Sequence, residues 1–87
     1  MTTQEFNSKY KDYLEEGHYG LDIENTEVVE YLDKEFEEEI KNNPSFKYAQ
    51  IKTKYNWSCV YASGDKTPTW RNEIDRILQK KSLPCEN

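Results

Sequence analysis

The sequence predicts a small α+β domain with the order α-α-β-β-α, in which helices pack on one face of a β-hairpin or small antiparallel sheet. The helices are predicted because stretches with apolar residues at helical spacing follow residues that cap helices well. The hairpin is predicted because β-branched and aromatic residues replace the helical period after residue 45. A chain of 87 residues holds one core. We expect a single domain over residues 1–81 and a flexible tail over residues 82–87.

The first helix is predicted to start at Thr2. Thr2 and Glu5 have the spacing of a capping box, in which each side chain satisfies a free amide at the start of a helix. Gly17 is expected to close the helix. The following segment, residues 17–23, is either a tight connector or a short edge strand. Four apolar side chains of the first helix share one face: Phe6, Tyr10, Tyr13 and Leu14.

A second helix is predicted with Asn25 or Thr26 as its cap and an end before Pro44. One face is apolar, with Val28, Val29, Leu32, Phe36 and Ile40 at helical spacing. The opposite face is strongly acidic. Carboxylates on adjacent helix positions fan outward by about 100° each, so this face predicts a solvated or partner-binding surface rather than a metal site. Its candidate contact residues are Glu30, Asp33, Glu37 and Glu38.

Two strands are predicted at about residues 46–54 and 57–63, joined by a turn in which Asn56 tolerates a positive φ. Strand alternation places Trp57, Cys59 and Tyr61 on one face of the hairpin. We expect one face to pack on helices and the other to expose aromatic side chains. A third helix is predicted with Thr67 as its cap and Pro68 at its first position.

The expected core draws on every predicted element and on helices two and three in particular. Large rings must supply much of it, because only 34% of the residues are hydrophobic while 14% are aromatic. The expected core residues are Phe6, Tyr10, Leu14, Val29, Leu32, Phe36, Ile40, Ile51, Val60, Trp70, Ile74 and Ile77, and the side chains of Leu21 and Ile23 are expected to turn inward as well.

The stretch from Gln50 to Tyr61 resembles a pattern found in small uncharacterised proteins of tailed phages and prophages. The matching residues are Gln50, Ile51, Lys52, Lys54, Tyr55 and Tyr61, whereas Asn56 stands where Gly is usual and Cys59 where Arg is usual. The resemblance implies a phage-type origin and supports the hairpin. It implies no activity and no functional residue, because those proteins have no known activity.

Little in the sequence favours catalysis, a cofactor or a membrane. The single histidine, His18, has no spacing that brings it to Cys59 or to an acid of the second helix, so we expect no enzyme site. Cys59 and Cys85 form neither a zinc motif nor a disulfide framework, and we expect no metal and no organic cofactor. With no signal-peptide pattern and no long apolar run, a cytoplasmic protein is expected.

Charge divides the chain into two unlike halves. Residues 1–43 carry 13 acidic and 4 basic side chains, whereas residues 44–87 carry 4 acidic and 8 basic ones. The preferred hypothesis is a non-enzymatic protein that acts on a host or phage protein through the acidic helical face, as a nucleic-acid mimic or inhibitor. The acidity alternatively serves only to keep the domain soluble.

The hairpin supports a different hypothesis. Lys52 and Lys54 lie close to Trp57 in the sequence, and lysines beside aromatic rings can neutralise phosphates and stack bases. The alternative function is therefore nucleic-acid binding by the hairpin. The net charge of -5 argues against it, since the acidic half of the chain repels phosphates. A small enzyme or ligand-binding domain is the third and least favoured alternative.

Overall fold

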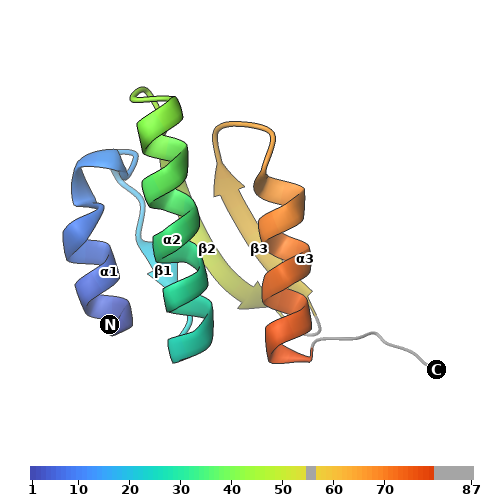
Figure 1. Cartoon of the computed structure of the whole chain (residues 1–87). Helices are drawn as coiled ribbons and strands as arrows, with labels where there is room; N and C mark the ends of the chain where they lie inside the picture. Colours follow the sequence, from blue (N-terminus) through green and yellow to red (C-terminus); the bar gives the residue numbers. More distant parts are fainter. Residues whose placement is uncertain (55–56, 80–87) are drawn as a thin grey trace.

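The computed structural model describes residues 1–54 and 57–79 and places three helices on one face of a three-stranded sheet (Figure 1). The α+β class is as predicted. The predicted turn at Tyr55 and Asn56 and the predicted tail over residues 82–87 lie outside the described residues. In chain order the elements are α1 (Thr3–Lys9), the 3-10 helix η1 (Lys11–Tyr13), β1 (Gly20–Asp22), α2 (Thr26–Asn42), β2 (Tyr48–Lys54), β3 (Trp57–Ala62) and α3 (Thr67–Leu78).

The sheet is mixed and has the strand order β1-β2-β3. β2 and β3 pair antiparallel, which confirms the predicted hairpin. β1 is the short edge strand that was one of two possibilities for residues 17–23, and it pairs parallel to β2. A purely antiparallel sheet was expected, but the parallel pairing of β1 makes the sheet mixed. A parallel pair needs a long crossover between its strands, and α2 provides that crossover here.

The first helix is shorter than predicted. The capping box of Thr2 and Glu5 is present, but α1 ends at Lys9 instead of near Gly17. The cause is strand pairing, because Leu14 forms a bridge with Tyr48 and the Glu15 amide donates a 2.8 Å hydrogen bond to the Tyr48 carbonyl. A continuing helix would have to give up these contacts.

The second helix starts where local chemistry suggests, whereas the third does not. The Asn25 side chain caps α2 and accepts a 3.0 Å hydrogen bond from the amide of Val28, and α2 ends at Asn42, before Pro44. α3 begins one residue earlier than predicted: Lys66 occupies the cap position without a side-chain hydrogen bond, and Thr67 is already helical.

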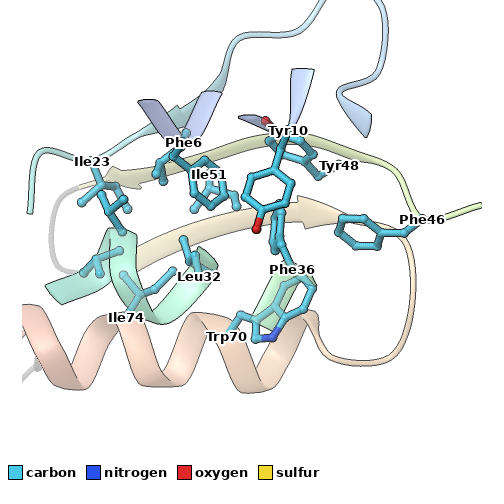
Figure 2. Packing of buried hydrophobic residues seen from close by; sticks show 13 residues of the cluster. Phe6, Tyr10, Ile23, Leu32, Phe36, Phe46, Tyr48, Ile51, Trp70 and Ile74 are labelled. Carbon is cyan, nitrogen blue, oxygen red and sulfur yellow. The ribbon is translucent and has the colours of Figure 1, made fainter. Parts of the chain in front are cut away.

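The core lies between the helices and the inner face of the sheet, and aromatic rings dominate it (Figure 2). Phe36 of α2 lies at its centre. The predicted core residues Phe6, Tyr10, Val29, Leu32, Phe36, Ile51, Trp70 and Ile74 are buried, as are Leu21 and Ile23. The predicted core residues Leu14, Ile40, Val60 and Ile77 are only partly buried and pack against the edge of the cluster.

Phe46 and Tyr48 are fully buried, although neither was in the predicted core. An irregularity in the β2–β3 register between Tyr48 and Gln50 explains why the burial of Tyr48 was not predicted. A bulge breaks the two-residue alternation, so that Tyr48 and Ile51, three positions apart, both face the core.

The outer edge of β1 is closed by side chains of α1. The Asn7 amide group both accepts from the Leu21 amide and donates to the Leu21 carbonyl, each at 2.9 Å. The Thr3 hydroxyl donates to the Ile23 carbonyl at 2.5 Å. Gly20 makes this close approach possible, because a Cβ there would lie 2.6 Å from Asn7 Oδ1. One edge of the sheet is thus satisfied within the chain.

Candidate functional site

The exposed carboxylates of α2 form a row along the side of the helix that faces away from the core. Glu27, Glu30, Glu37 and Glu38 are exposed at helical spacing, and we call them the acidic stripe. Side-chain exposure is 61% for Glu30, 59% for Glu37 and 62% for Glu38. Three of the four predicted acidic contact residues therefore lie at the surface.

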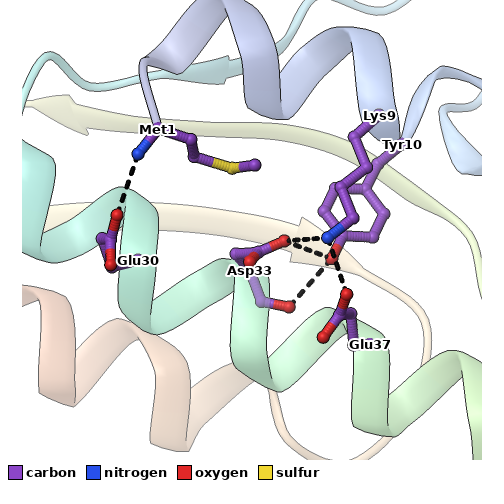
Figure 3. Close-up of polar contacts among 6 residues, drawn as sticks. All are labelled: Met1, Lys9, Tyr10, Glu30, Asp33 and Glu37. Atoms are coloured by element: carbon purple, nitrogen blue, oxygen red, sulfur yellow. Dashed lines mark hydrogen bonds and ion pairs between the residues drawn. The ribbon is translucent and has the colours of Figure 1, made fainter.

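Asp33, the fourth predicted acidic residue, has a different place. It lies between α1 and α2, where the Lys9 ammonium is 2.8 Å from Asp33 Oδ1 and 2.6 Å from Glu37 Oε2 (Figure 3). The Tyr10 hydroxyl is 2.6 Å from Asp33 Oδ1 and 2.8 Å from the Asp33 carbonyl oxygen. We call these four residues the Lys9 cluster. It joins α1 to α2, so Asp33 has a structural role.

The ionisation of this cluster follows from its contacts. Burial opposes the charge on Asp33, but hydrogen bonds from Lys9 and Tyr10 outweigh it and hold the pKa of Asp33 below its usual value. Burial raises the pKa of Tyr10, and the hydrogen bond to Asp33 raises it further. Hydrogen bonds to Asp33 and Glu37 raise the pKa of Lys9. At neutral pH the cluster therefore holds a charged Lys9, a charged Asp33 and a neutral phenol.

Two other acidic residues of α2 make ion pairs through exposed carboxylates. Glu30 lies 2.8 Å from the amino group of Met1 (Figure 3), and Glu38 is 3.9 Å from the Lys66 ammonium. Exposed ion pairs contribute only about 0–1 kcal/mol. A partner can therefore replace them at small cost, and the stripe remains available for binding.

The predicted basic residues lie on the other side of the molecule. Because Ile51 points into the core, Lys52 points to the sheet face that the helices do not cover. The register places Lys52 beside Cys59 and Lys54 beside Trp57, whose side chain lies outside the described residues. Tyr61, also on β3, is 55% exposed. The structure thus brings the two lysines together on one face but separates them from the acidic stripe by the thickness of the domain.

His18 does not lie beside Cys59, one of the two partners considered for it in a catalytic pair. His18 is exposed before β1, while Cys59 is in β3, and β2 lies between these two strands. Within residues 1–54 and 57–79, no three or more His, Cys, Asp or Glu side chains gather in a geometry that could hold a metal ion. No described helix has the length and apolar character needed to cross a membrane.

A groove that sequence reasoning missed lies between β3 and α3. It has a volume of about 590 Å³, and strand and helix residues line it together. Ser58 is one of them and is only 2% exposed. No residue pattern signals this groove, because α3 meets β3 only after folding.

The chain was compared with models of protein families, with curated proteins and with solved structures, and none of these comparisons gave a match.

Proposed function

We propose that this chain is a small non-enzymatic interaction protein that binds a basic surface of a protein partner through the acidic stripe. The observation that carries the proposal is the exposure of the stripe: the carboxylates of Glu30, Glu37 and Glu38 remain 59–62% exposed although each makes an ion pair. Such carboxylates can leave the ammonium group of their own chain and pair with a lysine or arginine of a partner. They can in this way compete with phosphates for the basic site of a nucleic-acid-binding protein.

The placement of the two halves of the chain supports the proposal. The acidic half contains α1, β1 and α2, which lie side by side, whereas β3 and α3 of the basic half lie on the other side of the domain (Figure 1). The charge asymmetry of the sequence is therefore also an asymmetry in space. A field of this kind steers a basic partner toward the α1–α2 side and raises the association rate.

The resemblance of the stretch from Gln50 to Tyr61 to phage proteins is the reason for proposing a phage or prophage origin and a host protein as the partner. A host enzyme that binds nucleic acid is the kind of partner that offers such a basic surface. In this account the protein acts inside the cell as an inhibitor that occupies the nucleic-acid site.

The experiment reverses the charges of stripe residues whose ion pairs are exposed and contribute little to stability. Asp33 and Glu37 are left unchanged, since they hold Lys9. The test variant is Glu30→Lys/Glu38→Lys, and the control is Glu15→Lys/Glu16→Lys, which changes the net charge equally in the exposed turn before β1. Tagged proteins are used to capture partners from host lysate at two salt concentrations, and the affinity of the captured protein is then measured.

We expect the Glu30→Lys/Glu38→Lys variant to bind the partner at least about tenfold more weakly at low salt, and the control to bind nearly as well as the wild type. Equal loss in both variants would mean that only total charge matters. Unchanged binding in both would remove the acidic stripe from the contact surface.

Nucleic-acid binding by the free sheet face is the second candidate. The observation that favours it is the alignment of Lys52 and Lys54 on one face with Tyr61, whose ring is 55% exposed. In this case Lys52→Glu/Lys54→Glu abolishes binding to single-stranded nucleic acid, and Glu30→Lys/Glu38→Lys strengthens it. The affinity also falls with salt, with a logarithmic slope of roughly 0.7 per neutralised phosphate.

A further inference from the structure

β3 forms the second edge of the sheet, and this edge is open. The strand order β1-β2-β3 gives β3 a partner on one side only. Among the described residues, no backbone or side-chain group bonds to the outer side of β3. The contrast with β1 is informative, because Asn7 and Thr3 satisfy that edge from α1. An open edge strand presents free amides and carbonyls that can pair with another strand.

The groove between β3 and α3 runs along this open edge. Four consecutive residues of β3, from Ser58 to Tyr61, line it. Neighbouring strand residues point to opposite faces of a sheet. A groove that touches residues of both faces must therefore follow the edge of the strand itself. Arg71, Asn72 and Asp75 of α3 form the other wall.

Two buried polar atoms in this groove lack a hydrogen-bond partner among the described residues. They are the Ser58 hydroxyl, in a residue that is 2% exposed, and Oδ1 of Asp75. Only one other buried side-chain atom in the described part of the chain shares this state, the Tyr48 hydroxyl. Buried polar groups are almost always bonded, so two such atoms in one groove indicate a place where a ligand completes the bonding.

The geometry of the layers decides what kind of ligand fits. Packed helices lie about 8–10 Å apart, whereas strands lie about 4.8 Å apart. Three helices on three strands must therefore overhang the sheet, and α3, which packs on β3, extends over the open edge (Figure 1). A bare extended segment fits under α3. A second copy of this chain does not, because its own α3 would occupy the same space.

We propose that an extended segment of a protein partner adds to the outer edge of β3 as a fourth strand. Its backbone pairs with β3, and alternate side chains point under α3. One of these side chains donates a hydrogen bond to Asp75 Oδ1 and accepts one from the Ser58 hydroxyl, so it carries a hydroxyl or amide group. Acidic residues flanking that side chain face Arg71 and Lys54 at the rim of the groove. This site is separate from the acidic stripe and does not depend on it.

The test uses a display library of short random peptides selected against the whole chain. The affinity of the most enriched peptide is then measured with the wild type and three variants. Ser58→Ala and Asp75→Asn change only the groove and are nearly isosteric. Asp22→Asn makes the same charge change at an exposed residue of β1, on the opposite edge of the sheet, and is the matched control. Thermal unfolding of each variant confirms that it is folded.

We expect Ser58→Ala and Asp75→Asn each to weaken peptide binding by about 3–10-fold, and the control to bind like the wild type. The bound peptide should also slow amide hydrogen exchange at alternate residues of β3. Failure to enrich any peptide, equal binding to all variants, or unchanged exchange in β3 would overturn the proposal. So would a dimer of the chain that the peptide dissociates, since it would assign the edge to a second copy.

Discussion

Replacement of Phe36 by Ala removes the ring on which the packing of all three helices depends. Phe36 is fully buried, and its ring centroid lies 4.9–5.3 Å from five other rings. These rings come from α1, α3, β2 and the segments that flank them, so few side chains can move to fill the space. They belong to Phe6, Tyr10, Phe46, Tyr48 and Trp70.

The expected cost of Phe36→Ala is about 3–5 kcal/mol, the range for deleting a ring from a core that cannot collapse. A domain of this size has a total stability of roughly 4–13 kcal/mol, at about 0.05–0.15 kcal/mol per residue. The variant should therefore lose a large part of its stability. Since about 1 kcal/mol shifts the Tm of such a domain by about 4–8 °C, the Tm should fall by at least about 12 °C.

Urea and thermal unfolding followed by circular dichroism measure this loss. The matched control is Tyr19→Ala, which removes a ring that is 83% exposed and should change the stability by less than about 0.5 kcal/mol. A Phe36→Ala protein within about 1 kcal/mol of the wild type would refute the reasoning, because α2 would then not pack through this ring.

Three further predictions concern polar contacts and backbone strain, all measured by urea unfolding. Asp33→Asn should cost about 1–2 kcal/mol at pH 7 through its ion pair with Lys9. Because the folded-state pKa of Asp33 is lowered, this stabilisation is present above about pH 4 and is lost as the pH falls further. The difference in unfolding free energy between the variant and the wild type should therefore become smaller below about pH 4. A difference that stays constant with pH would contradict the ion pair of Asp33 with Lys9. Tyr48→Phe should leave the stability unchanged or raise it by up to about 1 kcal/mol, since the hydroxyl has no partner among the described residues. Burial raises the pKa of Tyr48 to about 12, so wild-type stability is lost as the pH rises from about 10 to about 12, and the Phe variant should lose less. Gly20→Ala should cost about 1–3 kcal/mol, because φ is +83° and the new Cβ would meet Asn7; an unchanged midpoint would mean that this edge rearranges freely.

The elements that local chemistry controls could be predicted from the sequence. The capping box at Thr2, the cap at Asn25 and the stop before Pro44 act over a few residues, and the structure contains all three. The hairpin followed from β-branched and aromatic residues in the same way. The core positions Val29, Leu32 and Phe36 of α2 followed from the 3.6-residue period, whereas Ile40 near the end of the helix is only partly buried.

Features that depend on distant contacts could not be predicted. The end of α1 depends on pairing with Tyr48, and the burial of Tyr48 depends on a bulge that breaks strand alternation. The structural role of Asp33 depends on Lys9, which is 24 residues away in the chain. From the sequence alone, Asp33 was one more carboxylate on an acidic helix.

Of the two candidate surfaces, the acidic stripe could be predicted from the sequence and the groove beside β3 could not. Exposure of Glu30 and Glu38 could be predicted, because helix period and burial of the opposite face determine it. The groove beside β3 could not, since Ser58 is a common residue in a strand and Asp75 a common residue in a helix. Only the packing of α3 on β3 buries their polar atoms together.

Carboxylate labelling of the complex with the captured partner tests the central claim most directly. Exposed carboxylates are coupled to an amine with a carbodiimide, and mass spectrometry measures the modification of each residue with and without the partner. The account predicts that labelling of Glu27, Glu30 and Glu38 falls on binding while that of Glu15 and Glu16 does not change. Unchanged labelling of the acidic stripe in a complex that is demonstrably formed would contradict it.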